Sequence, residues 1–308
     1  MRIAFLATPD FALPSLEMLL RSGHELCVFT QPDRPVGRHN EPVPPAVKVA
    51  ALQHGIPVRQ FEKIRSSEGV AALRAYAPEL MVTAAFGQLL SQQNLDIPKY
   101  GCINVHASLL PKYRGAAPIQ WAIIEGERVT GVTTMMTELG LDTGDILLAE
   151  ETEIGADETA GELFARLSVL GAKVLAQTID RLQNGTLTRT KQDEARATKC
   201  RMIRKEDGHI DFSAGARRVH NLVRGSNPWP CAYAMLGDEP VKIWKTRLTD
   251  EKAEGNAGLC AVADAKRGLF VNAGEHLIEI AEIQFPGAKR MDAKTALLGR
   301  SLAGSAFR

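Results

Sequence analysis

Cysteines are few in this sequence, and their spacing fits neither a disulfide framework nor a metal site. The 308 residues include five cysteines, an odd number, and no two of them form a CxxC pair. They are Cys27, Cys102, Cys200, Cys231 and Cys260. Scattered cysteines argue against a disulfide-stabilised fold and against a zinc site, and they are typical of the reducing cytoplasm. We therefore expect a cytoplasmic protein without a bound metal.

Long apolar runs and nucleotide-binding motifs are also absent. No run approaches the ~18 apolar residues that a membrane span requires. The short run 1–7 ends at Thr8-Pro9-Asp10, so we interpret it as a buried first strand rather than a signal core. The sequence lacks both the GxGxxG fingerprint and the GxxxxGK[ST] loop. We therefore expect no membrane partner, and no binding of NAD or ATP in the usual way.

The chain also lacks an excess of charge of either sign. It has 37 Lys and Arg residues and 36 Asp and Glu residues, a net charge of +1. This balance argues against a nucleic-acid binder that is basic throughout. Residues 200–308, however, hold 17 basic and 13 acidic side chains, a net charge of +4, whereas residues 1–199 hold 20 and 23, a net charge of −3. A modest basic surface in the second part therefore remains compatible with RNA.

The composition is that of a globular protein with two domains. Hydrophobic residues make up 45% of the chain and charged residues 24%, and domains commonly hold ~100–200 residues. Strand-like and helix-like segments alternate in the first half, which predicts an α/β, Rossmann-like domain with a mainly parallel sheet and helices on both faces. The expected strands are 2–8, 24–30, 58–61, 80–85, 102–106, 131–137 and 145–154. The expected helices are 13–22, 46–54, 67–76 and 159–182, and 31–45 is expected to be a long loop.

The second half has a different pattern. After a helix at 214–224, short strand-like segments separated by Gly and Asp turns are expected at 232–236, 241–246, 259–263, 268–272 and 277–284. Five short strands in about 100 residues predict a small β-barrel, with the oligonucleotide-binding type as the natural candidate. We expect an N-terminal catalytic domain at 1–188, a linker at 189–206 and a C-terminal barrel at 207–308.

One strand end and one turn carry residues suited to chemistry. Asn104 and His106 end a predicted strand, where residues i and i+2 point to the same side. Asp142 lies in a Gly-flanked turn, Gly140 to Asp145, and could approach the same histidine. An amide, an imidazole and a carboxylate suit acyl-type transfer to an amine, because they can stabilise an oxyanion and move a proton. A structural turn pair remains the alternative, and a metal site is less favoured because no HxH, HxxxH or CxxC partner is near.

The same stretch closely resembles the methionyl-tRNA formyltransferase family. The resemblance runs from residues 101–120 (GCINVHASLLPKYRGAAPIQ) to Thr8–Ala12, Thr30–Pro35, Gly131–Thr133 and Gly140–Asp145, and to Ile210–Phe212, Asn227–Pro230 and Val241–Trp244 near the end of the chain. SLLP and LDTGD mark the wider superfamily, whereas TQPDRP and GAAPIQ are more specific. The matches extend over the whole chain.

This resemblance implies a reaction and a set of residues. The implied reaction is transfer of the formyl group of 10-formyltetrahydrofolate to the α-amino group of methionyl initiator tRNA, by direct attack through a tetrahedral intermediate. Asn104, His106 and Asp142 match the family's catalytic residues. We expect Asn104 and protonated His106 to stabilise the oxyanion, while Asp142 holds His106. The implied folate-binding residues are Ser108, Leu109, Leu110, Pro111, Phe86, Gly87, Gln88, Leu89, Leu90, Leu139, Gly140 and Leu141.

The expected tRNA contacts are less directly specified. We expect them at Arg34, Arg38, Arg204, Lys242 and Lys245. Family members often carry a Gly-Arg-Gly-Lys-Lys run where residues 37–41 read GRHNE, so the loop here has lost two lysines and should contact fewer phosphates. A nucleotide-sugar N-formyltransferase and a noncatalytic folate- or RNA-binding module are the alternatives. We expect a monomer, because no long exposed apolar face stands out.

Overall fold

The computed structural model describes residues 1–36 and 41–308, which form two compact units. Unit 1 contains residues 1–115, 129–153 and 164–200. Unit 2 contains residues 116–128, 154–163 and 201–308. The chain therefore passes between the units several times. Arg38 lies outside the described residues, and no helix in the described part of the chain is long and apolar enough to cross a membrane.

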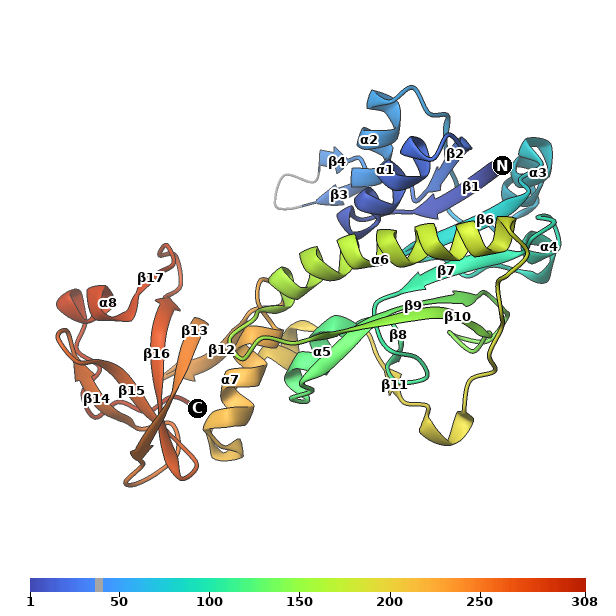
Figure 1. The fold of residues 1–308 in the computed structure, drawn as a ribbon. Coiled ribbons are helices and arrows are strands. Elements are labelled where there is room, and N and C mark those ends of the chain that lie inside the picture. Colours follow the sequence, from blue (N-terminus) through green and yellow to red (C-terminus); the bar gives the residue numbers. More distant parts are fainter. Residues whose placement is uncertain (37–40) are drawn as a thin grey trace. The chain divides into compact units, whose positions relative to one another are not determined.

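Unit 1 is built on a seven-stranded sheet (Figure 1). Its strands are β1 (Arg2–Ala7), β2 (Glu25–Thr30), β5 (Val58–Gln60), β6 (Leu80–Ala84), β7 (Cys102–His106), β9 (Val129–Met136) and β10 (Ile146–Glu153), in the order β10-β9-β7-β6-β1-β2-β5. β9 runs antiparallel to both of its neighbours, and the other pairs are parallel. The predicted, mainly parallel, Rossmann-like sheet is confirmed.

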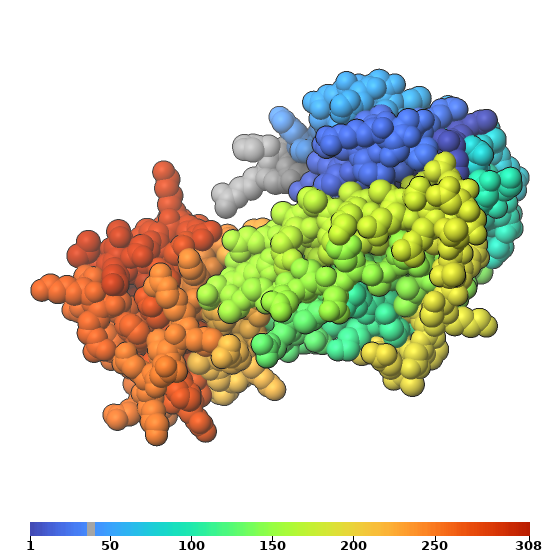
Figure 2. Space-filling view, in the orientation of Figure 1, coloured from blue at the N-terminus to red at the C-terminus, as the bar shows by residue number. Residues whose placement is uncertain are grey.

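Helices cover both faces of this sheet. They are α1 (Leu13–Arg21), α2 (Ala46–Gln53), α3 (Ser67–Tyr76), α4 (Gln92–Leu95) and the part of α6 (Ala160–Gln183) that belongs to unit 1, with a 3-10 turn η1 (Asp10–Ala12) before α1. Leu73 of α3 packs on Leu6 and Met81 on one face. On the other face Gly171 of α6 lies so close to β7 that an added Cβ would be 2.9 Å from Val105 Cγ1. Figure 2 shows α6 in yellow-green, and the long helix expected at 159–182 is confirmed.

Two small strand pairs extend unit 1. β3 (Arg34–Val36) pairs with β4 (Glu41–Val43), so the long loop expected at 31–45 contains two short antiparallel strands. β8 (Arg114–Gly115) pairs with β11 (Lys199–Cys200). Gly115 has φ +127°, and a Cβ there would lie 2.1 Å from the Cys200 carbonyl oxygen, so only glycine fits. A 3-10 turn, η2 (Glu194–Arg196), precedes β11.

Unit 2 contains an antiparallel sheet. Its strands are β12 (Ala232–Leu236), β13 (Glu239–Lys252), β14 (Cys260–Asp264), β15 (Gly268–Ala273) and β16 (His276–Gln284), in the order β12-β13-β16-β15-β14, and β17 (Met291–Asp292) pairs with β16. All five predicted strands are confirmed. The edge strands β12 and β14 do not pair with each other. Instead, the C-terminal segment forms backbone hydrogen bonds with both strands. Met235 of β12 bonds to Arg308, and the Cys260 N–H of β14 donates to the Ser305 carbonyl oxygen.

Two helices, α7 (Ala216–Gly225) and α8 (Ala293–Gly299), pack on that sheet, and α5 (Pro118–Ile124) packs on α7. Unit 2 also contains the 3-10 turns η3 (Lys205–Gly208) and η4 (Phe212–Ala214). Val219 and Val223 of α7 are buried in the core that includes Ile243 of β13. α7 also packs closely on α5, as shown at Gly225: a Cβ added there would lie only 2.6 Å from Ile124 Cγ1. The segment 116–128 is therefore packed into unit 2.

Candidate active site

Asn104 lies at the centre of the candidate site, with one end of its amide fixed. Asn104 and His106 share a face of β7, as alternation along a strand requires. Thr83 stands opposite Asn104 on β6, and its hydroxyl donates a hydrogen bond of 2.8 Å to Asn104 Oδ1. The amide oxygen is therefore occupied by the protein. Asn104 Nδ2 is the end that can donate to a ligand.

His106 is buried, with 6% of its side chain exposed, and each ring nitrogen faces a protein oxygen. Nε2 lies 2.9 Å from the Tyr113 carbonyl oxygen. A carbonyl only accepts, so Nε2 carries a proton and donates. Nδ1 lies 3.7 Å from Asp142 Oδ2. The second proton of a charged imidazolium is therefore on the nitrogen that faces the carboxylate.

Asp142 reaches His106 from a turn that follows the antiparallel strand β9. The turn is tight, because a Cβ at Gly144 would lie 1.8 Å from the Met136 carbonyl oxygen. Asp142 itself has φ +52°, in the left-handed region that Asp adopts more readily than most residues. Its Oδ2 accepts a hydrogen bond of 2.8 Å from the Gly115 N–H. Asn104, His106 and Asp142, separated by up to 38 positions in the sequence, thus lie around one space.

Cys102 shares the face of β7 with Asn104 and His106, but it belongs to the core. Its side chain is 1% exposed. Burial raises the pKa of the Cys102 thiol to about 12. The thiol therefore stays protonated and is a poor nucleophile. Cys102 is therefore a packing residue of the core.

The Ser108–Pro111 segment is held by hydrogen bonds of the Ser108 and Thr133 hydroxyls to backbone groups. The buried Ser108 hydroxyl donates to the Lys112 carbonyl oxygen at 2.7 Å. Thr133 Oγ1 donates to the Ser108 carbonyl oxygen at 2.7 Å and accepts from the Leu110 N–H at 3.1 Å. Ser108 and Leu110 are buried, whereas Leu109 and Pro111 are half-buried. The segment therefore has a fixed shape, and its Ser108 side chain is turned inward.

The loop 86–90 follows β6, and hydrogen bonds from residues at the ends of β1 and β2 hold it in place. Thr8 Oγ1 and Gln31 Nε2 donate to the Phe86 carbonyl oxygen at 2.9 and 3.0 Å. Gln88 uses its side chain internally, since its Oε1 accepts from the Ile64 N–H and its Nε2 donates to a carbonyl. Gly87 has φ +75°. This loop is thus fixed by β1 and β2, and Gln88 could reach a ligand only through its backbone.

Large apolar side chains stand in solvent near these loops. Leu89 and Leu139 are each 65% exposed, and Leu141 is 56% exposed, while Leu90 is partly buried. Gly140, between the last two leucines, is exposed. Exposed leucines beside a polar cluster are typical of a surface that an apolar ligand covers.

The expected tRNA-binding cations are exposed side chains. Arg34, in unit 1, forms an ion pair of 2.6 Å with Glu62. Arg204, Lys242 and Lys245, in unit 2, are exposed. Lys242 Nζ lies 5.9 Å from the centre of the Trp244 ring, over which the Arg290 guanidinium also lies, at 4.9 Å. Arg38 cannot be placed, because it lies outside the described residues.

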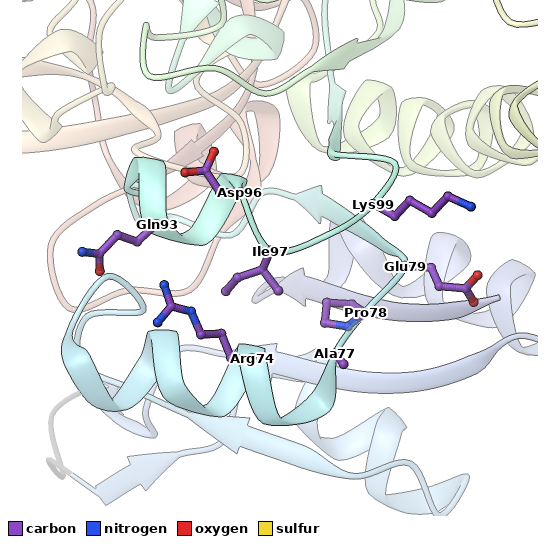
Figure 3. Close-up of a pocket in the computed structure, with 8 residues that line it drawn as sticks. All are labelled: Arg74, Ala77, Pro78, Glu79, Gln93, Asp96, Ile97 and Lys99. Carbon is purple, nitrogen blue, oxygen red and sulfur yellow. The ribbon is translucent and has the colours of Figure 1, made fainter.

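Two other features bear on the choice of site. Across residues 1–36 and 41–308, no group of three or more His, Cys, Asp or Glu side chains could hold a metal ion. A surface hollow beside α3 and α4 contains none of the predicted site residues (Figure 3). Its charged side chains are of both signs: Arg74, Glu79, Asp96 and Lys99. It therefore indicates no particular ligand.

The structure adds supporting residues that sequence reasoning missed. Arg114 is 3% exposed and pairs with Glu194 through two bonds, of 3.0 and 2.7 Å. The bonds from Arg114 lower the pKa of the Glu194 carboxyl below its usual range. Gln192 accepts from Arg114 and donates to the turn of Asp142. No local pattern could have linked these residues, which come from segments 48 to 80 positions apart.

Comparisons with known proteins agree with this fold. Residues 1–179 match the family model described as formyl transferase, and residues 202–301 match that of the formyl transferase C-terminal domain. The methionyl-tRNA formyltransferase of Ruminiclostridium cellulolyticum is 48% identical over 98% of this chain and 97% of its own length. That of Citrifermentans bemidjiense is 50% identical, over 98% and 94%.

Solved structures with the same fold are more distant. A sugar 3N-formyltransferase, WlaRD, determined in the presence of dTDP and 5-N-formyl-THF, has a TM-score of 0.68 and 19% identity, covering 94% of this chain and 99% of its own. HypX from Aquifex aeolicus in complex with tetrahydrofolic acid has a TM-score of 0.66 and 15% identity, covering all of this chain and 51% of its own.

The fold, the site and the family models define an enzyme of the formyltransferase class. The relatives of 48–50% identity over nearly the whole chain narrow this class. The chain belongs to the methionyl-tRNA formyltransferase family.

Proposed function

We propose that this chain transfers the formyl group of 10-formyltetrahydrofolate to the α-amino group of methionyl initiator tRNA, in the cytoplasm, as a step of translation initiation. The observation that carries the proposal is the cluster of Asn104 and His106, on one face of β7, with Asp142, which lies in the turn after β9 and 3.7 Å from His106. The names of the relatives support the tRNA substrate. The folate-bound neighbours support a folate co-substrate.

In the proposed mechanism the cluster stabilises negative charge on the formyl oxygen. Asn104 Nδ2 donates to that oxygen, because Thr83 holds the other end of the amide. Protonated His106 supplies positive charge beside it. The distance of 3.7 Å from Nδ1 to Asp142 Oδ2 is longer than a hydrogen bond, so the Nδ1–H of a protonated ring remains available to the reacting oxygen.

The proton and bond changes follow from this arrangement. A bond forms between the methionine nitrogen and the formyl carbon, and the bond from that carbon to the folate nitrogen breaks. The proton lost by the amine passes to the folate nitrogen through His106 or through a water beside Asp142. No serine or cysteine nucleophile is needed, and the buried, protonated Cys102 does not provide one.

The residues present fit a folate. Its flat ring system would lie against Leu89, Leu139 and Leu141, whose exposed apolar surfaces would lose contact with water. The fixed backbone of Ser108 to Pro111 and of the loop 86–90 would recognise its polar edge. When bound, the folate supplies the formyl group, and the chain's own residues orient that group toward Asn104.

We propose that unit 2 binds the acceptor arm of the tRNA through an oligonucleotide-binding-like barrel. The hydrogen bonds from the C-terminal segment to β12 and to β14 support a barrel, because this segment joins the two edge strands of the sheet. Lys242, Lys245 and Arg204 would contact phosphates, and Trp244 offers an aromatic face between two cations. Arg34 and Arg38 would contact the RNA from unit 1, and the chain would act as a monomer.

A substrate comparison tests the proposed function. The full chain is incubated with 10-formyltetrahydrofolate and either methionyl initiator tRNA or an amino sugar nucleotide, and transferred formyl groups are measured. We expect formylation of the methionyl tRNA only. Formylation of the sugar only would instead make the chain a nucleotide-sugar formyltransferase, and the absence of turnover on both would favour a binding module.

A further inference from the structure

We propose that Gln192 is a positioning residue of the active site, which holds the turn of Asp142 against His106. This inference rests on the proposed function, in which Asp142 acts on His106. Gln192 Nε2 donates to the carbonyl oxygens of Asp142 and Gly144, at 2.8 and 2.7 Å. Its Oε1 accepts from Arg114 Nε at 3.0 Å. One side chain thus bridges the two ends of the turn and connects them to a buried arginine.

The chemistry of the partners fixes the orientation of this amide. An arginine only donates hydrogen bonds and a carbonyl only accepts them. Gln192 must therefore turn its oxygen to Arg114 and its nitrogen to the turn, and no flipped arrangement satisfies both. Neither a carboxylate nor an aliphatic side chain can replace it, because neither can donate to the two carbonyls.

Arg114 is itself held rigidly. It is 3% exposed, and its two terminal nitrogens bond to the two carboxylate oxygens of Glu194. A paired guanidinium in a buried place is fixed in direction. Gln192 is therefore anchored to a rigid group on one side while it holds the Asp142 turn on the other.

The Asp142 turn needs such a support. Its carboxylate is tied to the Gly115 N–H, but its backbone is in the left-handed region, at φ +52°. Without Gln192 the carbonyls of Asp142 and Gly144 would lose their shared donor. The carboxylate would then be held by its bond to Gly115 alone, and the 3.7 Å approach to His106 Nδ1 would loosen.

The same segment also supports the other side of His106. Thr198 Oγ1 accepts from the Tyr113 N–H at 2.8 Å, and the Thr198 carbonyl accepts from the Arg114 N–H at 2.9 Å. The Tyr113 carbonyl oxygen accepts the hydrogen bond that His106 Nε2 donates. Both oxygens that face the histidine ring are therefore placed with the help of residues 192–198.

The test compares Gln192→Leu with the wild-type full chain, using 10-formyltetrahydrofolate and methionyl initiator tRNA. Leucine keeps a similar volume and removes all three bonds. We expect kcat to fall about 10- to 100-fold, as for a displacement of a catalytic group by about 1 Å, while both KM values stay within about twofold. Lys191→Leu, an exposed neighbour, is the matched control and should leave kcat unchanged.

A double-mutant cycle with Asp142→Asn then asks whether Gln192 acts through Asp142. In the Asp142→Asn background, Gln192→Leu should lower kcat by no more than about twofold, because the group that it positions is already lost. Full additivity of the two effects, or an unchanged kcat in the single variant, would overturn the proposal. If Gln192→Leu does not fold, Gln192→Glu replaces it in the cycle, with the same outcomes, because it keeps the acceptor for Arg114.

A second readout does not depend on activity. Hydrogen exchange of the Gly115 amide reports its bond to Asp142 Oδ2. We expect this amide to exchange at least about tenfold faster in Gln192→Leu than in the wild type, and Lys191→Leu to show no change. Equal exchange in all three proteins would contradict the positioning role. A wild type that lacks formylation activity would instead contradict the proposed function, and the exchange result would still decide the role of Gln192.

Discussion

The proposed catalytic cluster of unit 1 and the basic surface of unit 2 hold their polar side chains in opposite ways. In the cluster, Asn104, His106 and Asp142 each have a fixed protein partner, and His106 is 6% exposed. On the unit 2 surface, Lys242 and Lys245 are exposed side chains of β13. Stabilisation of a developing charge needs dipoles that are already in place, whereas phosphate contacts tolerate long, mobile cations.

This difference predicts which kinetic constant each region controls. Changes in the cluster should lower kcat, because they remove interactions made in the transition state. Changes on the unit 2 surface should raise the KM for tRNA, because they weaken binding of the substrate as a whole.

Asn104→Asp should have the largest effect. It keeps the shape of the side chain but replaces the Nδ2 donor with a second oxygen, which repels a developing oxyanion. We expect kcat to fall by about 10²–10³-fold, as for loss of one oxyanion donor. Steady-state formylation measures this. A loss confined to the KM for tRNA would show that Asn104 binds substrate rather than stabilising charge.

Thr83→Val should have a smaller effect of the same kind. It removes the donor that fixes Asn104 Oδ1, so the amide can rotate, and we expect kcat to fall about tenfold with KM unchanged. Thr30→Val is the matched control, since the Thr30 hydroxyl is buried and has no hydrogen-bond partner among the residues that the structure describes. Equal activities of the two variants would show that Thr83 does not position Asn104.

Lys242→Ala and Lys245→Ala should act on tRNA binding alone. We expect each to raise the KM for tRNA a few-fold, and to reduce the slope of log affinity against log salt by about one, with kcat unchanged. Binding titrations at several salt concentrations measure the slope. Lys266→Ala, an exposed lysine at the turn between β14 and β15, is the control. An identical slope in all three variants would remove Lys242 and Lys245 from the interface.

The smallest expected effect is a pH dependence of unit 2 stability at His220. Burial lowers the pKa of this histidine below 6.5, and Arg224 and Arg217 act in the same direction, while the Ala156 carbonyl and Asp157 oppose them. The unfolded state therefore binds the proton more readily, so stability is fully present above pH 6.5 and is lost as the pH falls through the lowered folded-state pKa. We expect the Tm to fall as the pH is lowered below 6.5.

Tryptophan fluorescence can follow this transition in unit 2 alone. All three tryptophans of the chain, Trp121, Trp229 and Trp244, belong to unit 2. Thermal unfolding is recorded from pH 7.5 downward, for the wild type and for His220→Gln. The variant should show a weaker dependence on pH near 6. The same dependence in both proteins would mean that another group titrates.

Much of the fold follows from the periodicity of hydrophobic residues and from the turn-forming residues between the periodic segments. The long helix α6 and the five strands β12 to β16 are predicted to within a few residues, except that β13 extends beyond residue 246 to Lys252. The strands β3 and β4 were missed because prolines such as those at 35 and 42 are typical of loops. In the structure these two prolines lie opposite each other in the strand pair. The hydrogen bonds from the C-terminal segment to β12 and β14 were missed too, because they join positions that are far apart in the chain.

The candidate site is predicted only in part, for the same physical reason. The positions of Asn104 and His106 follow from the alternation of β7, and Asp142 stands out in its Gly-flanked turn. Gln192 and Thr198 stand in a polar segment without periodicity. Their partners lie 50 and 85 positions away, so only the folded chain brings them to the site. The residues proposed to do the chemistry carry local sequence signals, whereas the residues that contact their turn and strand end do not.

In the proposed mechanism the cluster around His106 performs the chemical step and does not bind the tRNA. A single-turnover experiment tests it, with enzyme in excess over methionyl initiator tRNA and saturating 10-formyltetrahydrofolate. We expect His106→Ala to bind the tRNA with unchanged affinity and to form formyl-methionyl tRNA at least about 100-fold more slowly than the wild type. A rate equal to that of the wild type would contradict the account.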